Sequence, residues 1–305
     1  MQQIGYSALP SLIDDGNDLF ARYIQFLDVS PASARTYVRA LRSLEKWLKE
    51  NGISRPVRED LLAYKKSLQQ TLKPATVQSY ITVARLFFTF LSDQGIYPNI
   101  AERLKGAKVD AEFKKDALTS SQIRRILESI DGDSIREKRD RALILLMITG
   151  GLRCAEAAAA NVDDLRTLND KTVLYIKGKG RSEKREFVVV DPRTEDCIRN
   201  YLRAREPGVC ALFASTSNNN RENMTSRAVS GIVKKRLIAA GFDSDRLTAH
   251  SLRHSCVTLA LLGNVPLDEV RQHARHKSIQ TTLGYSHRLQ AQNNRSSAAI
   301  AETLF

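Results

Sequence analysis

The chain has 305 residues, a length that predicts two domains at the usual size of roughly 100–200 residues per domain. Hydrophobic residues make up 42% of it and charged residues 27%, a composition that excludes an intrinsically disordered protein. The 47 Lys and Arg exceed the 34 Asp and Glu by 13, which favours a polyanionic partner, most simply nucleic acid rather than a membrane surface. Because neither an apolar run of about 18 residues nor a signal peptide is evident, we expect a soluble, cytoplasmic protein.

Helical patterns fill the first third of the chain. Ser30 and Pro31 begin one strong helix, which Gly52 ends. A second strong pattern covers residues 74–95. Weaker helical patterns lie at 14–28, 58–70 and 99–105. These elements predict a compact bundle of four or five helices over residues 1–108.

A second domain is predicted after an exposed linker at 109–116, where charges of both signs interrupt the apolar periodicity. Residues 117–305 contain two convincing strands, at 172–177 and 185–190, joined by a glycine-rich turn. Helices are predicted on both sides of the strands, including about 134–149, 192–204, 225–240, 250–262, 266–275 and 278–284. The expected fold class is therefore mainly α with a small β-sheet, an N-terminal helical bundle followed by an α+β domain.

The histidines are concentrated near the end of the chain, all five between residues 250 and 287. His250 and Arg253 are three residues apart and so share one helix face. His273 and His276 have the only metal-like spacing, and the four cysteines form no CxxC pair. We therefore predict a functional site in this segment, with no metal ion, no cofactor and no disulfide framework.

Four motifs stand in a recognisable order. They are Gly151-Leu152-Arg153-Cys154-Ala155-Glu156, then Gly178-Lys179-Gly180 in a hairpin turn, then His250-x-x-Arg253, and finally His276 followed nine residues later by Tyr285. Each motif is weak alone, but together they resemble the tyrosine recombinases, or phage-type integrases, and most closely their short, two-domain, Xer-like members. The resemblance covers nearly the whole chain.

The resemblance implies an enzyme that cleaves and rejoins duplex DNA through a covalent 3′-phosphotyrosine, without metal or ATP because the protein–DNA bond stores the phosphodiester energy. Tyr285 would be the nucleophile, and Arg153 and Arg253 would bind the phosphate oxygens with planar forks of donors. The implied supporting roles are proton acceptor for His250, general acid for Lys179, phosphate hydrogen bonding for His276 and an accessory, buttressing position for Glu156.

The implied partners are duplex DNA with inverted-repeat core sites and further copies of the chain, as a tetramer on two DNA sites, with a related recombinase as a further candidate. Candidate phosphate contacts follow helical spacing at Arg35, Arg39, Arg42 and Lys46, although a merely solvated helix face explains them equally well. A C-terminal exchange helix ending in Ile300, Leu304 and Phe305 would dock on a neighbouring subunit. A type IB topoisomerase and a DNA-binding regulator with a decayed catalytic domain remain as alternatives.

The sequence departs from the family pattern in two places. Many members have Leu-Gly-His where this chain has Ala274-Arg275-His276, so a flexible glycine is replaced by a charged residue. The tail after Tyr285 lacks the His-Pro-Arg ending of chromosome-dimer resolvases, which leaves the biological role open.

Overall fold

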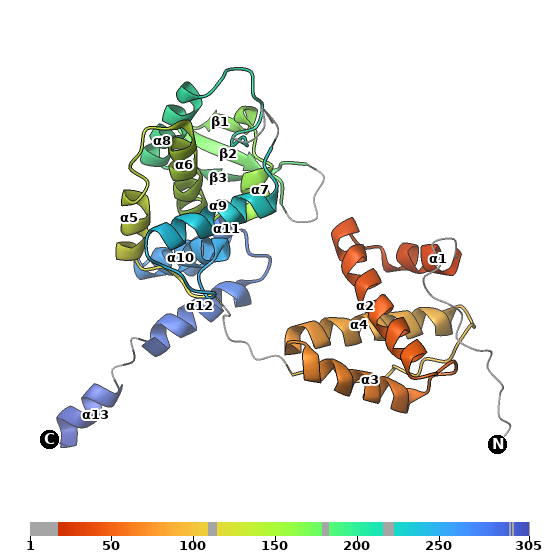
Figure 1. Ribbon diagram of the computed structural model, residues 1–305. Coiled ribbons are helices and arrows are strands. Elements are labelled where there is room, and N and C mark those ends of the chain that lie inside the picture. Colours follow the sequence, from red (N-terminus) through yellow and green to blue (C-terminus); the bar gives the residue numbers. More distant parts are fainter. Residues whose placement is uncertain are drawn as a thin grey trace. The chain divides into compact units, whose positions relative to one another are not determined.

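The chain divides into two compact units, Met1–Glu112 and Phe113–Phe305, each with its own hydrophobic core. The computed structural model describes residues 18–108, 115–178, 183–215, 223–292, 294 and 296–304 (Figure 1). Within these ranges, no helix combines the length and the apolar character needed to cross a membrane.

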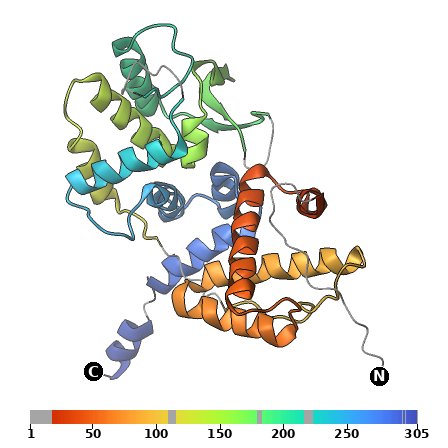
Figure 2. The same cartoon turned by 45° about the vertical axis from the view of Figure 1, so that its right-hand side comes forward.

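The described part of the N-terminal unit is a helical bundle. It contains α1 (Asp18–Leu27), α2 (Pro31–Glu50), α3 (Arg58–Thr71) and α4 (Pro74–Asp93). The Ser30 hydroxyl caps α2 by accepting from the Ser33 amide at 3.3 Å, as expected for a Ser-Pro helix start. Aromatic side chains fill the centre, where Tyr23 meets Phe87 edge to face at 5.3 Å between ring centroids. Figure 2 shows α2 crossing the other long helices of this unit.

The predicted helix at 99–105 is wrong, because this segment forms turns. The Asn99 side chain accepts from the Ala101 amide at 3.2 Å, and the Leu104 amide donates to the Ala101 carbonyl at 3.0 Å. Asn competes for nearby backbone groups in this way and ends regular structure. The apolar residues of the segment still join the core of the N-terminal unit.

The C-terminal unit combines helices with a three-stranded antiparallel sheet, so the prediction of a mainly α chain with a small β-sheet is confirmed. Its described helices are α5 (Ser120–Glu128), α6 (Ile135–Thr149), α7 (Cys154–Ala158), the 3-10 helix η1 (Val162–Asp164), α8 (Pro192–Ala204), α9 (Ser226–Ala239), α10 (Ala249–Leu262), α11 (Leu267–Ala274), α12 (Ile279–Gln292) and α13 (Ser296–Leu304). The strands are β1 (Leu165–Leu168), β2 (Lys171–Ile176) and β3 (Glu186–Val189), in the order β1-β2-β3. Helix α10 contacts α6, α9, α11 and α12, and it thereby connects the unit's core to its C-terminal helices.

Strand β1 was not among the predicted strands. Only Leu165 of its four residues is partly buried, so the strand lacks the alternation that identifies a half-buried strand. The signal lies in the turn that follows, where Asn169 and Asp170 both have positive φ, at 47° and 60°. Two such residues make the type of hairpin turn that matches strand twist.

Helix α12 is longer than the predicted 278–284. It continues through Gly284 to Gln292, so Tyr285 lies inside a helix rather than after one. The side chain of Tyr285 is consequently fixed in direction by the helix and packs with Val257 of α10 and Val270 of α11.

Candidate active site

A sharp turn between α6 and α7 carries Arg153. Gly151 has φ 58°, and a Cβ placed on it would lie 3.1 Å from the Cys256 sulfur, so glycine lets the turn approach α10 closely. Leu152 is fully buried in the core beside it. Arg153 itself is the N-cap residue of α7, with 30% of its side chain exposed. The turn therefore presents one guanidinium from a rigid support.

Glu156 is a buried carboxylate that holds two arginines. It accepts from the Arg153 guanidinium at 2.5 Å and from the Arg153 backbone amide at 2.9 Å. Arg275 donates to Oε2 at 2.9 Å, the oxygen that also accepts from the Arg153 amide. Burial raises the pKa of this carboxyl, but the Arg275 and Arg153 cations outweigh burial and bring the pKa below its ordinary value.

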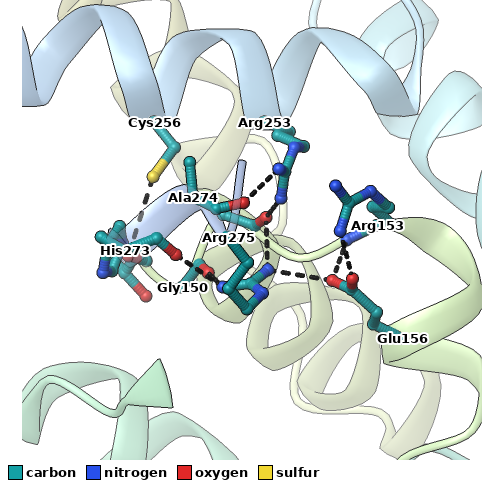
Figure 3. Close-up of polar contacts among 10 residues, drawn as sticks. Gly150, Arg153, Glu156, Arg253, Cys256, His273, Ala274 and Arg275 are labelled. Carbon is teal, nitrogen blue, oxygen red and sulfur yellow. Dashed lines mark hydrogen bonds and ion pairs between the residues drawn. The ribbon is translucent and has the colours of Figure 1, made fainter. Parts of the chain in front are cut away.

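Arg253 is buried on α10 and faces the same turn (Figure 3). Its guanidinium donates to the Gly151 carbonyl at 2.6 Å and to the Ala274 carbonyl. Burial, together with the nearby Arg153 and Arg275 charges, lowers the pKa of Arg253 to about 10. The group therefore remains cationic near neutral pH, and two of its five N–H donors orient it on backbone.

Tyr285 is 8% exposed and lies between two histidines. Its hydroxyl is 2.5 Å from Nδ1 of His254, and its ring stacks on His276 with centroids 6.1 Å apart. Burial is the largest cause that raises the pKa of Tyr285, to about 12. His276 is oriented by Thr282, whose hydroxyl is 2.9 Å from His276 Nδ1, and burial followed by nearby arginines lowers its pKa to about 4.

His250 lies in the first turn of α10 and is exposed. Partial desolvation is the largest cause that lowers its pKa, and the Arg253 and Arg153 charges add to the effect. His254 follows one helical turn later, so the two imidazoles share one side of α10. The structure therefore brings Arg153, Glu156 and Arg253 into one linked group and joins Tyr285 to His276 and His254.

The predicted general acid, Lys179, lies outside the described residues. Its neighbours in the hairpin differ from each other: Lys177 is exposed, whereas the Lys184 ammonium donates to the Ala159 carbonyl at 2.8 Å and pairs with Asp164. Lys184 is thus held at the base of the hairpin by a carboxylate.

The four predicted DNA-contacting residues all belong to α2. Each is exposed, and they lie opposite the buried side of the helix: Arg35, Arg39, Arg42 and Lys46. Lys46 is 3.6 Å from Glu50 on the same helix, a surface pair that contributes little to stability.

Sequence reasoning gave no catalytic or positioning role to three residues of the site, His254, Thr282 and Arg275. Signals for two of them were present, because His254 directly follows Arg253 and Thr282 precedes Tyr285 by three residues, on the same helix face. For Arg275, the sequence showed only that an arginine replaces the glycine found in many members of the family. In the described ranges, no group of three or more His, Cys, Asp or Glu is arranged to hold a metal ion.

Two family profiles match this chain, one in each unit. The phage integrase family matches residues 116–292, and the N-terminal SAM-like domain of phage integrases matches residues 18–95. A relative from Pyrococcus furiosus, tyrosine recombinase XerA, is 28% identical over 267 residues, covering 88% of this chain and 87% of that protein. Tyrosine recombinase XerD of Lacticaseibacillus casei is 27% identical over 282 residues, covering 88% and 93%.

Solved structures show the same fold. The XerH site-specific recombinase bound to its palindromic difH substrate in a post-cleavage complex superposes with a TM-score of 0.76 at 22% identity, covering 93% of this chain and 84% of that one. A lambda integrase dimer on a COC′ core site gives 0.67 at 16% identity, covering 86% and 95%.

The chain has a helical unit followed by an α+β unit, in which arginines, histidines and a buried tyrosine are clustered. This combination is that of the class of enzymes that cleave and rejoin DNA strands through a tyrosine. Within that class, the chain belongs to the phage integrase family, whose profile matches more than half of its residues. It is a site-specific DNA recombinase of the tyrosine type.

Proposed function

We propose that Tyr285 is the nucleophile with which this recombinase cleaves one DNA strand at a time. The observation that carries the proposal is the placement of its phenol, buried on α12, hydrogen-bonded to one histidine and stacked on another. The same unit supplies two arginines oriented by carbonyl and carboxylate groups, which suits recognition of a phosphate.

The reaction conserves bonds and charges. The Tyr285 oxygen forms a bond to the scissile phosphorus, and the bond from phosphorus to the 5′ oxygen breaks. Negative charge grows on the non-bridging oxygens in the transition state, where Arg153 and Arg253 donate to it and His276 adds a hydrogen bond. The 3′-phosphotyrosine keeps the energy of the phosphodiester, so attack by a 5′ hydroxyl restores the DNA and frees Tyr285.

Two protons move during cleavage. The phenolic proton goes to an imidazole, and the contact at 2.5 Å supports His254 as the acceptor, while His250, the acceptor expected from the sequence, lies one turn away on α10 beside Arg253. The departing 5′ oxygen takes a proton from Lys179. The contacts of Lys184 support this choice, because its ammonium is already occupied by Asp164 and the Ala159 carbonyl.

We infer that the predicted N-terminal domain, residues 1–108, binds DNA through the positive charge on α2. Exposed Arg35, Arg39, Arg42 and Lys46 would contact phosphates, and the net charge of +13 favours a polyanion along the whole chain. The substrate is duplex DNA with inverted-repeat core sites, and the protein acts in the cytoplasm, where such DNA is accessible.

Recombination requires two DNA sites and therefore several subunits, four in the assembly that we propose, either identical or shared with a related recombinase. Helix α13 would link them, because all of its described side chains are exposed, including Ile300 and Leu304. A cavity of about 450 Å³ in the C-terminal unit provides an apolar acceptor for them in a neighbouring copy. Its lining includes Leu118, Leu259, Leu262 and Leu289, together with Tyr285 and His254.

A substrate nicked near the cleavage site tests the proposal, because loss of the short 5′ fragment traps the covalent adduct. Tyr285→Phe removes one oxygen and should abolish the adduct while DNA binding persists. Tyr175→Phe, outside the site on β2, serves as the matched control and should leave the adduct unchanged. An adduct formed by the Tyr285→Phe protein would overturn the assignment.

A further inference from the structure

Arg275 occupies a backbone conformation that rarely suits an arginine. It is the C-cap of α11 with φ 54° and ψ 46°, in the left-handed region that glycine adopts without steric cost. Its Nε atom is buried without a hydrogen-bond partner in the described structure, which is a second local cost. Two energetically unfavourable features at one residue indicate that its side chain has a compensating role.

The Arg275 side chain runs into the site, as Figure 3 shows. Only 6% of it is exposed. One terminal nitrogen donates to the carbonyls of Gly150 and His273 at 3.1 and 2.6 Å. The other donates to the Gly151 carbonyl and to the Glu156 carboxylate, both at 2.9 Å. A planar fork with two donors on each end makes all four contacts, which the single ammonium of lysine does not reproduce.

These contacts join two segments that carry the predicted phosphate-binding residues. Glu156, held by Arg275 on one side, holds the Arg153 guanidinium on the other. His276 directly follows Arg275, and its backbone amide donates to the Arg271 carbonyl at the end of α11. Arg253 donates to the Gly151 carbonyl that Arg275 also contacts.

We propose that Arg275 is a positioning residue for DNA cleavage, which fixes Arg153 through Glu156 and sets the start of the segment that carries His276. Arg275 is buried and acts through these neighbours. The inference rests on the proposed phosphate-binding role of Arg153. It also accounts for an arginine at the place where many members of the family have glycine: the charged side chain supplies a crosslink that glycine lacks.

The variant that tests this is Arg275→Gly, because glycine accepts the observed φ and leaves the backbone unstrained. A suicide substrate with a normal scissile phosphodiester should be cleaved 10- to 100-fold more slowly, the range for loss of a supporting contact behind a functional group. DNA binding and melting temperature are measured alongside. Arg271→Ala is the matched control, since Arg271 is on the same helix and pairs with Asp268 at the surface; it should cleave like the unmutated protein.

A second substrate separates positioning from general damage. A scissile methylphosphonate has a methyl group in place of one non-bridging oxygen, so its transition state has one negative charge fewer and depends less on Arg153. On this substrate the Arg275→Gly defect should shrink to less than about threefold, as should the defect of Arg153→Ala. Arg275→Lys should behave like Arg275→Gly, because lysine keeps the charge but not the fork.

The outcomes are distinguishable. Equal slowing of Arg275→Gly on both substrates would mean that Arg275 has only a structural role, and unchanged cleavage of the phosphodiester would mean that it has none. Either result overturns the inference. If instead Arg153→Ala cleaves the normal phosphodiester at full rate, the proposed role of Arg153 fails first, independently of Arg275.

Discussion

The hydroxyl of Tyr285 lies 2.5 Å from Nδ1 of His254, which joins the middle of α12 to the second turn of α10. Burial is the largest cause of both shifts in acidity: the pKa of Tyr285 rises to about 12 and that of His254 falls to about 4. At neutral pH the phenol therefore keeps its proton and donates a hydrogen bond to an uncharged imidazole. Proton transfer to the imidazole is therefore favoured only as the phenolic oxygen bonds to the scissile phosphorus, beside the Arg253 cation that lowers the pKa of Tyr285.

If His254 takes the phenolic proton, removal of its imidazole must leave this task to hydroxide. We expect His254→Ala to slow adduct formation by about 100-fold at pH 7, within the usual range for general base catalysis. Its rate should then rise with pH between 6 and 8, while the unmutated enzyme shows a flat profile over this range. His250→Ala is the comparison. A pH-dependent rate in His250→Ala, with a flat profile in His254→Ala, would assign the proton to His250.

The same histidines predict how stability depends on pH. His254 and His276 have pKa values of about 4 in the folded protein against 6.5 ordinarily, since burial disfavours their charged forms. Between pH 6.5 and 4 the unfolded chain therefore binds more protons, and the free energy of unfolding decreases as pH falls through this window. Thermal melts across pH 4–8 measure the effect. His254→Gln should flatten the slope, whereas His287→Gln, at an exposed residue, should not.

Local features of the sequence were sufficient to predict the two long helices of the N-terminal unit. Ser30 and Pro31 define where α2 begins, and Pro74 does so for α4, because capping and proline geometry act within a few residues. Strand β1 was missed because its side chains are mostly exposed, and the Asn169-Asp170 turn was the only signal for it.

The candidate site was only partly accessible from sequence. Motif order was enough to select Arg153, Arg253 and Tyr285. The contact between Tyr285 and His254 depends on how α12 packs on α10, and the pair formed by Arg275 and Glu156 joins residues 119 positions apart. Such contacts depend on tertiary packing, so neither the periodicity nor the spacing of residues in the sequence predicts them.

The general acid is tested by a change in the leaving group. A thiolate departs without a proton, so a 5′-phosphorothiolate substrate should restore cleavage by Lys179→Ala to nearly the unmutated rate. On a normal phosphodiester the same variant should be slowed by at least 100-fold. Lys184→Ala is the control. It loses the Asp164 pair, so it should lower the melting temperature, and the phosphorothiolate substrate should not increase its cleavage rate. Rescue of Lys184→Ala by sulfur would move the acid to Lys184.

Phosphate contacts by α2 are tested by salt dependence. Each contact contributes about 0.9 to the slope of log affinity against log salt on duplex DNA. Arg39→Ala with Arg42→Ala should therefore reduce the slope by about 1.8 and weaken binding to all sequences alike. Arg199→Ala removes an exposed arginine that pairs with Glu195 on α8, and it should leave the slope unchanged. A double variant with the unmutated slope would mean that this face of α2 is merely solvated.

If α13 is exchanged between subunits as proposed, assembly and cleavage should be interdependent, since the proposed acceptor cavity is lined by Tyr285 and His254 themselves. Burying Ile300 and Leu304 would contribute roughly 1.5–3 kcal/mol each as an upper estimate, enough to favour pairing of two DNA sites. Deletion of residues 296–305 should therefore keep binding to a single site, weaken pairing by about 10- to 100-fold and alter cleavage.

The acceptor side provides the matching variant. Leu262 lines the cavity and is 52% exposed, so Leu262→Asp should fold normally and reduce pairing as the deletion does. Because both changes remove the same contact, combining them should cost no more than either alone. Gel-shift assays with two labelled sites measure pairing. Thermal melts of the protein without DNA distinguish a tail that docks on a neighbouring subunit from one that folds back on its own subunit. A deletion that lowers the melting temperature of the monomer but leaves pairing intact would show that α13 folds back on its own subunit.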